Sequence, residues 1–73
     1  HQDAYLYQLL LNAEDYAAHD LASGRSVYIH VVGGQLSVNG EILKEGDGAT
    51  IKGADKIEFV GKAQSEALVF DLP

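Results

Sequence analysis

The stretch Val27–Ile51, with the sequence VYIHVVGGQLSVNGEILKEGDGATI, decides the fold of this chain. Val27, Ile29 and Val31 share one parity of its first apolar run, which is the period of two expected of a pleated strand. Asn39-Gly40 is its clearest turn signal, because both residues tolerate the positive φ that a type I′ hairpin requires. The stretch therefore predicts the centre of a small antiparallel β domain, with a hairpin at Asn39-Gly40.

Outward from this centre, short apolar runs alternate with glycine-rich or polar turns. Turn signals recur at roughly the eight-to-twelve-residue spacing that is typical of sandwiches and barrels. We predict one all-β domain over residues 1–73, a cupin or jelly-roll β-barrel of about eight short antiparallel strands. The strands are expected at Ala4–Leu11, Tyr16–Leu21, Val27–Val32, Leu36–Val38, Glu41–Leu43, Ala49–Ile51, Lys56–Val60 and Glu66–Leu72.

Two local alternatives stay open in the sequence. Tyr16–Leu21 fits either a strand or a helical turn at Tyr16–His19, and we favour the strand because Ala17 and Leu21 share its parity with His19. Gly33-Gly34 either closes a tight hairpin or lets one long strand bend from one sheet to another.

Composition and charge narrow the class of protein. The chain has 73 residues, no cysteine and a formal charge of −6, and its five basic residues are scattered. Nucleic-acid binding draws on concentrated positive charge, so direct contact with DNA or RNA is not expected. No apolar run approaches the roughly 18 residues of a membrane span, so we expect a soluble, cytoplasmic protein. The chain begins with His1 instead of Met, which fits either a processed piece or an artificial boundary, and a piece of a longer protein would be separated from its partner.

Four pieces of the sequence, taken in order, carry a resemblance to a known family. They are Gly24–Gly34, Val38–Gly40, Gly46–Ala49 and the closing Leu68–Pro73. Together they resemble the C-terminal cupin half of pirin-like proteins. The resemblance implies two barrels in one chain, of which the N-terminal barrel holds a metal, usually iron, through histidines and a glutamate. It also implies a parent that is either a quercetin 2,3-dioxygenase, opening a flavonol ring with molecular oxygen, or a regulatory protein.

The resemblance implies a metal-binding motif, but the positions of its metal ligands hold other residues in this chain. The general cupin pattern is Gly, His-x-His, Glu and Gly, followed downstream by Pro-x-Gly-x-x-His. Anchored on Gly34 and Gly46, its four ligand positions fall on Leu21, Ser23, Val27 and Ala49. These side chains cannot supply a divalent metal site. We therefore expect no metal, cofactor or catalytic residue in this chain, with the family metal in the N-terminal half.

Other chemistry-bearing groups favour structural roles. His19 and His30 lie in different predicted strands, with no carboxylate at a telling spacing, so surface or hydrogen-bonded histidines are favoured over a metal site. Glu45–Gly48 lacks the alternating oxygen ligands of a calcium loop and is favoured as a turn. Ser23 and Ser26 flank a glycine without the spacing of a nucleophile elbow, so they are expected to be turn residues.

The row Tyr28, His30 and Val32 is the one candidate functional surface. It is predicted to face outward. Burial of these side chains under a neighbouring barrel and their exposure to solvent are given equal odds. The expected partner is the N-terminal cupin half of the same protein or a second copy of this chain. Strands such as Tyr5–Leu11 or Glu66–Leu72 are expected to offer uncovered edges or faces.

The sequence supports two functional hypotheses. The first is a metal-free structural and interaction module that supports a metal-bearing N-terminal cupin, with every catalytic ligand outside this chain. The second is a small-molecule-binding or regulatory cupin without catalysis, whose apolar barrel holds a hydrophobic ligand. A barrel this small is more often filled by its own side chains, which favours the first hypothesis.

Overall fold

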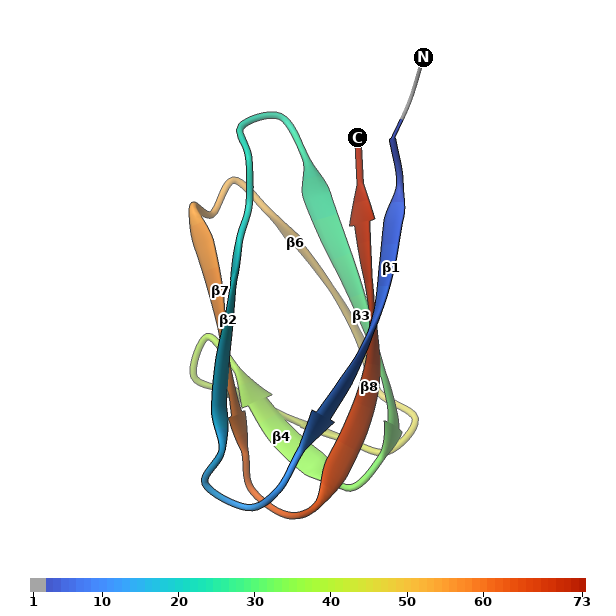
Figure 1. Cartoon of the computed structure of the whole chain (residues 1–73), viewed down its shortest axis with the longest axis vertical. Coiled ribbons are helices and arrows are strands. Elements are labelled where there is room, and N and C mark those ends of the chain that lie inside the picture. Colours follow the sequence, from blue (N-terminus) through green and yellow to red (C-terminus); the bar gives the residue numbers. More distant parts are fainter. Residues whose placement is uncertain (1–2) are drawn as a thin grey trace.

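A computed structural model describes residues 3–73, which form eight strands in two four-stranded antiparallel sheets (Figure 1). Each predicted strand is present, and each of its ends lies within one residue of the prediction. The ambiguous segment Tyr16–Leu21 is a strand, and no helix occurs among the described residues. The strands are β1 (Tyr5–Leu11), β2 (Tyr16–Asp20), β3 (Ser26–Gly33), β4 (Gln35–Val38), β5 (Glu41–Lys44), β6 (Gly48–Lys52), β7 (Lys56–Gly61) and β8 (Ser65–Leu72).

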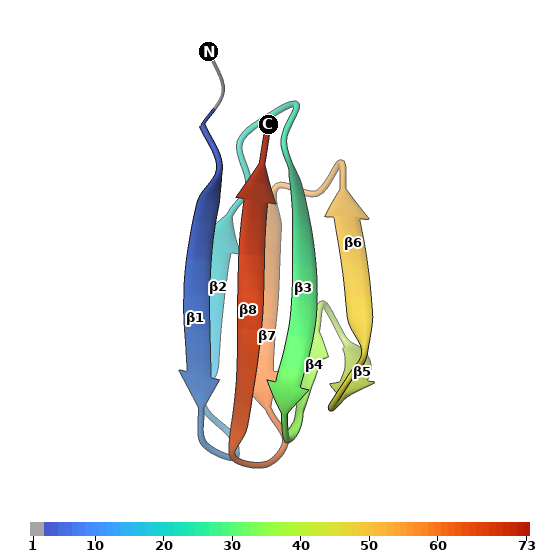
Figure 2. The ribbon, with the colours of Figure 1, turned by 90° about the vertical axis from the view of Figure 1, so that its right-hand side faces the viewer.

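The strand order is that of a jelly roll. One sheet runs β1-β8-β3-β6 and the other β2-β7-β4-β5, so most consecutive strands lie in different sheets. Figure 2 shows the first sheet in front of the second, as two layers of a sandwich. Such double-sheet folds of short strands are the architecture of cupins. The predicted fold class is therefore confirmed.

Asn39-Gly40 closes the hairpin between β4 and β5, as predicted. Asn39 has φ of 48° and Gly40 has φ of 88°, and Val38 pairs with Glu41 on either side of the turn. Asn39 also holds the neighbouring strand, because its side-chain oxygen accepts a hydrogen bond from the Glu58 backbone N–H at 2.8 Å. The turn thus fixes both the β4–β5 register and the contact with β7.

Gly33-Gly34 is the point where the chain passes from one sheet to the other. β3 ends at Gly33 in the first sheet and β4 begins at Gln35 in the second, and the two strands do not pair. Of the two alternatives, the bend between sheets is confirmed and the tight hairpin is wrong. Gly34 has φ of +78°, and a Cβ at this position would overlap the Gln64 carbonyl oxygen and lie 2.7 Å from Ser65 Cα.

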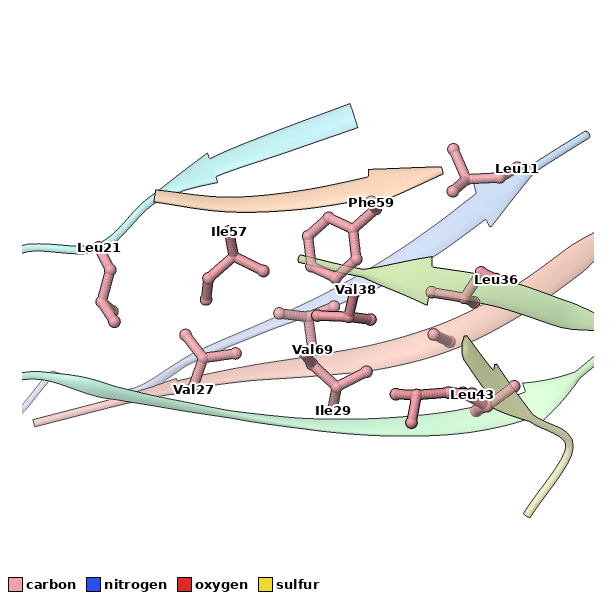
Figure 3. Packing of buried hydrophobic residues seen from close by; sticks show 12 residues of the cluster. Leu11, Leu21, Val27, Ile29, Leu36, Val38, Leu43, Ile57, Phe59 and Val69 are labelled. Carbon is pink, nitrogen blue, oxygen red and sulfur yellow. The ribbon is translucent and has the colours of Figure 1, made fainter. Parts of the chain in front are cut away.

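The core forms where the inward-facing side chains of the two sheets meet. Figure 3 shows Ile57 and Phe59 of β7 directed at Val27, Ile29 and Val69 of the opposite sheet. All of these residues except Val69 are at most 2% exposed. Burying such a side chain contributes about 1.5–3 kcal/mol relative to leaving it exposed. Since the interior is packed in this way, the sandwich is held together by its own side chains.

The close approach at Gly34 generates a stability prediction. Gly53 has φ of +74°, and a Cβ added there would meet nothing within 4 Å, so this position isolates the backbone cost alone. We expect Gly53→Ala to lower the free energy of unfolding by about 1–2 kcal/mol. Gly34→Ala should cost at least about 2 kcal/mol more, because it adds a backbone clash to the same strain. Urea denaturation of both variants measures the difference, and equal losses would contradict this account of the bend.

Candidate functional site

The outer side of the β1-β8-β3-β6 sheet carries several exposed apolar side chains, interrupted by the hydrogen-bonded pair Gln8 and Glu66. On β1, Leu9 and Leu11 pack on the core, so Leu6 and Leu10 point away from it, and they are 60% and 65% exposed. On β3, Tyr28 and Val32 are exposed on the same side of the sheet. We call this surface the outer apolar face; its residues are Leu6, Leu10, Tyr28, Val32, Leu68, Phe70 and Leu72.

Strand register brings these residues into rows across the sheet. Phe70 of β8 pairs with Leu6 on one side and with Tyr28 on the other, and the rings of Phe70 and Tyr28 lie 5.9 Å apart. In the next row, Leu68 pairs with His30. An exposed surface of this kind, on residues that are neighbours in space, is typical of an interaction site.

The predicted row Tyr28, His30 and Val32 lies on β3, at one side of the outer apolar face, next to the side chains of β8. Tyr28 and Val32 are 38% and 42% exposed and His30 is half-buried, so the predicted outward direction is confirmed. Its role in an interface stays a prediction. The remaining members of this face lie on β1 and β8, the strands that were expected to offer uncovered edges or faces.

The two strands that were expected to offer edges differ in the structure. β1 is at the edge of its sheet, which agrees with the prediction. β8 pairs with β1 on one side and with β3 on the other, so of the predicted edges or faces Glu66–Leu72 offers a face and no free edge. The outer side chains of β8 nevertheless contribute to the outer apolar face.

A charged cluster closes one end of the sandwich around Asp71. Asp71 is on the inward parity of β8 and only 5% exposed. Arg25 Nε donates to Asp71 Oδ1 at 2.6 Å, and His19 Nε2 lies 2.7 Å from Asp71 Oδ2. Arg25 also donates to the carbonyl oxygen of Asp71 at 3.2 Å and to that of Asp3 at 2.6 Å. The cluster thus joins β8, β2 and the turn before β3.

The ionised form of Asp71 is favoured in this cluster. Burial raises the pKa of its carboxyl, but the hydrogen bonds from Arg25 and His19 and the charges of these partners outweigh burial. The pKa of Asp71 therefore lies below that of an ordinary aspartate. An ionised carboxylate only accepts hydrogen bonds, so His19 must carry a proton on Nε2.

Sequence reasoning found only part of this cluster. His19 is hydrogen-bonded, which was one of the favoured interpretations, but no partner was predicted for Arg25. The sequence separation between His19 and Asp71 is 52 residues, so spacing along the chain carries no sign of their contact. The available signal was Asp71 itself, because a charged residue on the inward parity of a strand requires partners.

The positions of the cupin metal ligands hold packing residues. Leu21 and Val27 are buried in the core, and Ala49 packs against it. Among residues 3–73 no group of three or more His, Cys, Asp or Glu side chains is placed to hold a metal ion. The residues present therefore do not fit the family metal. In the predicted turn after β5, the Asp47 carboxylate accepts a hydrogen bond from the Lys44 backbone N–H at 2.8 Å.

The strand order defines a cupin, and Leu21, Val27 and Ala49 stand at positions that the cupin pattern assigns to metal ligands. The chain belongs to the quercetinase C-terminal cupin domain family, whose sequence profile matches residues 1–72. It is 37% identical to a quercetin 2,3-dioxygenase of Escherichia coli K12 over all 73 residues, and it spans only 32% of the length of that relative. The resemblance to pirin-like proteins is therefore confirmed.

Solved structures agree with this assignment. The crystal structure of YhhW from Escherichia coli superposes with a TM-score of 0.96 at 37% identity, over 100% of this chain and 31% of that one. The bacterial pirin YhhW in complex with nickel(II) matches equally well, with a TM-score of 0.96. A cupin domain of an XRE-family transcriptional regulator from Enterobacter cloacae has a TM-score of 0.77 at 13% identity, which shows the fold alone. The described residues contain no helix long and apolar enough to cross a membrane.

The Asp71 cluster generates a prediction for stability and its pH dependence. We expect Asp71→Asn to lower the free energy of unfolding at neutral pH by about 2–3 kcal/mol, since it weakens two charge-assisted hydrogen bonds. A lowered native pKa stabilises the fold above the unfolded pKa of about 3.9, and this contribution is lost as the pH falls through the native value. The gap between wild type and variant should therefore shrink below about pH 4.

Chemical denaturation at a series of pH values measures this gap. Asp20→Asn is the matched control, because Asp20 is an exposed aspartate of β2 and its replacement should change stability by less than about 0.5 kcal/mol. A gap between wild type and Asp71→Asn that stays constant into acid would contradict the role assigned to the carboxylate.

Proposed function

We propose that this chain is the structural half of a two-cupin protein, a metal-free cupin that packs against and supports a metal-bearing N-terminal cupin. The outer apolar face is the observation that carries the proposal. Leu6 and Leu10 are more than half exposed on it, and exposed apolar side chains that are neighbours in space are typical of interaction sites. The chain spans 32% of the curated relative that it matches, so the relative has ample length for a second barrel.

The occupant that we propose for the outer apolar face is the N-terminal cupin of the same protein. A linked domain binds at a high effective concentration, so a surface of moderate size is enough to hold it. Interfaces between domains favour aromatic and aliphatic residues at their centre, which matches the row of Leu6, Phe70 and Tyr28. A second copy of this chain is the competing occupant, and nucleic acid and membrane are not proposed as partners.

The chemistry that we propose for the parent protein lies outside this chain. The relative from Escherichia coli is named quercetin 2,3-dioxygenase, and YhhW was crystallised with nickel(II). By extension, the parent is proposed to be a cytoplasmic enzyme that oxidises a flavonol at a metal in its N-terminal half. The contribution of this chain is mechanical: it covers the neighbouring barrel and limits the motion of that barrel. No catalytic step is assigned to a residue of this chain.

The metal-free character of the chain is directly testable. We expect the purified 73-residue chain to bind well under one equivalent of iron, nickel, copper or zinc, because Leu21 and Val27 occupy ligand positions with buried side chains. Elemental analysis after dialysis against each metal measures this. A stoichiometric metal that is lost in His19→Gln or His30→Gln would contradict the proposal.

The docking of the outer apolar face is tested by placing a charge on it. Leu6 and Ile42 are both exposed, but Ile42 is on β5 of the opposite sheet and serves as the matched control. We expect Leu6→Glu to lower the Tm of the C-terminal cupin within the longer protein by at least about 5 °C more than within the 73-residue chain. Ile42→Glu should shift both proteins equally, as measured by calorimetry.

Two results would contradict the proposed occupant. One is an equal effect of Leu6→Glu in the longer protein and in the 73-residue chain. The other is a longer protein that dimerises through this face, so that sedimentation shows a dimer that Leu6→Glu dissociates. In the chain alone, the exposed face should instead cause concentration-dependent self-association that Leu6→Glu weakens.

A further inference from the structure

An open groove runs along the side of the sandwich where both sheets end. β1 is the edge of one sheet and β2 the edge of the other, and the two strands lie on the same side of the molecule without pairing (Figure 2). Between them lies a groove of about 330 Å³. This volume is at the lower end of the roughly 300–1,000 Å³ of small-molecule sites. The lining of the groove includes Tyr7, Leu9, Ala17, His19, Phe59 and Val69.

The floor and walls of the groove are apolar and aromatic. Phe59 and Val69 belong to the core and are only 2% and 3% exposed, so they form a fixed base. Ala17 faces inward from β2, and its small side chain leaves the space open. Tyr7 stands beside His19 with ring centroids 5.4 Å apart. A flat ring of about the size of a benzene derivative suits such a groove.

One polar group gives the groove a direction. His19 Nε2 is hydrogen-bonded to the Asp71 carboxylate at 2.7 Å, and Arg25 holds that carboxylate from its other oxygen. Because the carboxylate accepts from Nε2, a His19 ring with a single proton carries that proton on Nε2 and offers the second ring nitrogen, Nδ1, as an acceptor. Arg25 is committed to Asp71, so the cluster favours a neutral hydrogen-bond donor over an anion.

We infer that this groove binds a small hydroxylated aromatic ring, a phenol, whose ring lies on Phe59 and Val69 and whose hydroxyl donates to His19 Nδ1. The apolar floor favours an apolar ring, and the aromatic wall of Tyr7 favours a flat one. The oriented imidazole favours a ligand that carries a hydroxyl group. Asp71 and Arg25 act as positioning residues, because they orient the imidazole without touching the ligand. The site is distinct from the outer apolar face, since Tyr7 and Leu9 have the opposite parity of β1 from Leu6.

The test compares phenol with its methyl ether, anisole, on the 73-residue chain by two-dimensional NMR. A ligand of this size is expected to bind with a Kd of about 1 mM and to shift the resonances of Tyr7, Ala17 and His19. Anisole has the same ring but no donor, so it should bind about five- to tenfold more weakly. Equal affinities, or the absence of saturable shifts with phenol, would overturn the proposal.

Variants locate the site. Ala17→Leu fills the groove and should abolish the phenol shifts while the dispersed spectrum persists, whereas Ala63→Leu, at an exposed loop position, should leave them intact. Undiminished phenol binding in a folded Ala17→Leu would overturn the placement. The comparison of phenol with anisole needs no variant and decides the inference even when Ala17→Leu does not fold. Leu6→Glu should retain phenol binding, so failure of the docking proposal and failure of this inference are distinguishable.

Discussion

The antiparallel pairing of β3 with β8 is the contact on which the rest of the structure depends. It runs from Ser26 opposite Leu72 to Gly33 opposite Glu66, and it sets the inward parity of both strands. Val27, Ile29 and Val69 then build the core on one side while Tyr28 and Phe70 meet on the other. A slip of one residue would exchange the two sides, bringing the outer apolar face into the interior and the core into water.

The same pairing decides which side chains fill the interior at the positions of the cupin ligands. The interior of a small barrel holds either ligating side chains or packing side chains, because there is no room for both. Here Leu21 and Val27 take ligand positions and are buried. Packing side chains at these positions add apolar contacts to the core. This matters for a short chain without disulfides, whose buried surface is small.

The local pattern of the sequence was enough to predict where the strands lie, but it did not predict which strands pair with one another in every case. Alternation and the turn residues placed every strand, and Asn39-Gly40 predicted its own hairpin, because these features depend on neighbours in the chain. The position of β8 inside its sheet depends on contacts with β1 and β3, which are far away in sequence. The cluster of His19, Arg25 and Asp71 and the groove beside it escaped prediction for the same reason: their parts come from separate strands.

The position of β8 also has a consequence for the way the chain acquires its structure during synthesis. β8 is the last of the eight strands to be translated, yet it lies between β1 and β3, which cannot join one sheet without it. Until it emerges, β1 presents an unpaired edge and apolar side chains to its surroundings, and nonlocal pairing of this kind is slow to form. The emergence of Ser65–Leu72 is therefore the step that allows β1 and β3 to join one sheet.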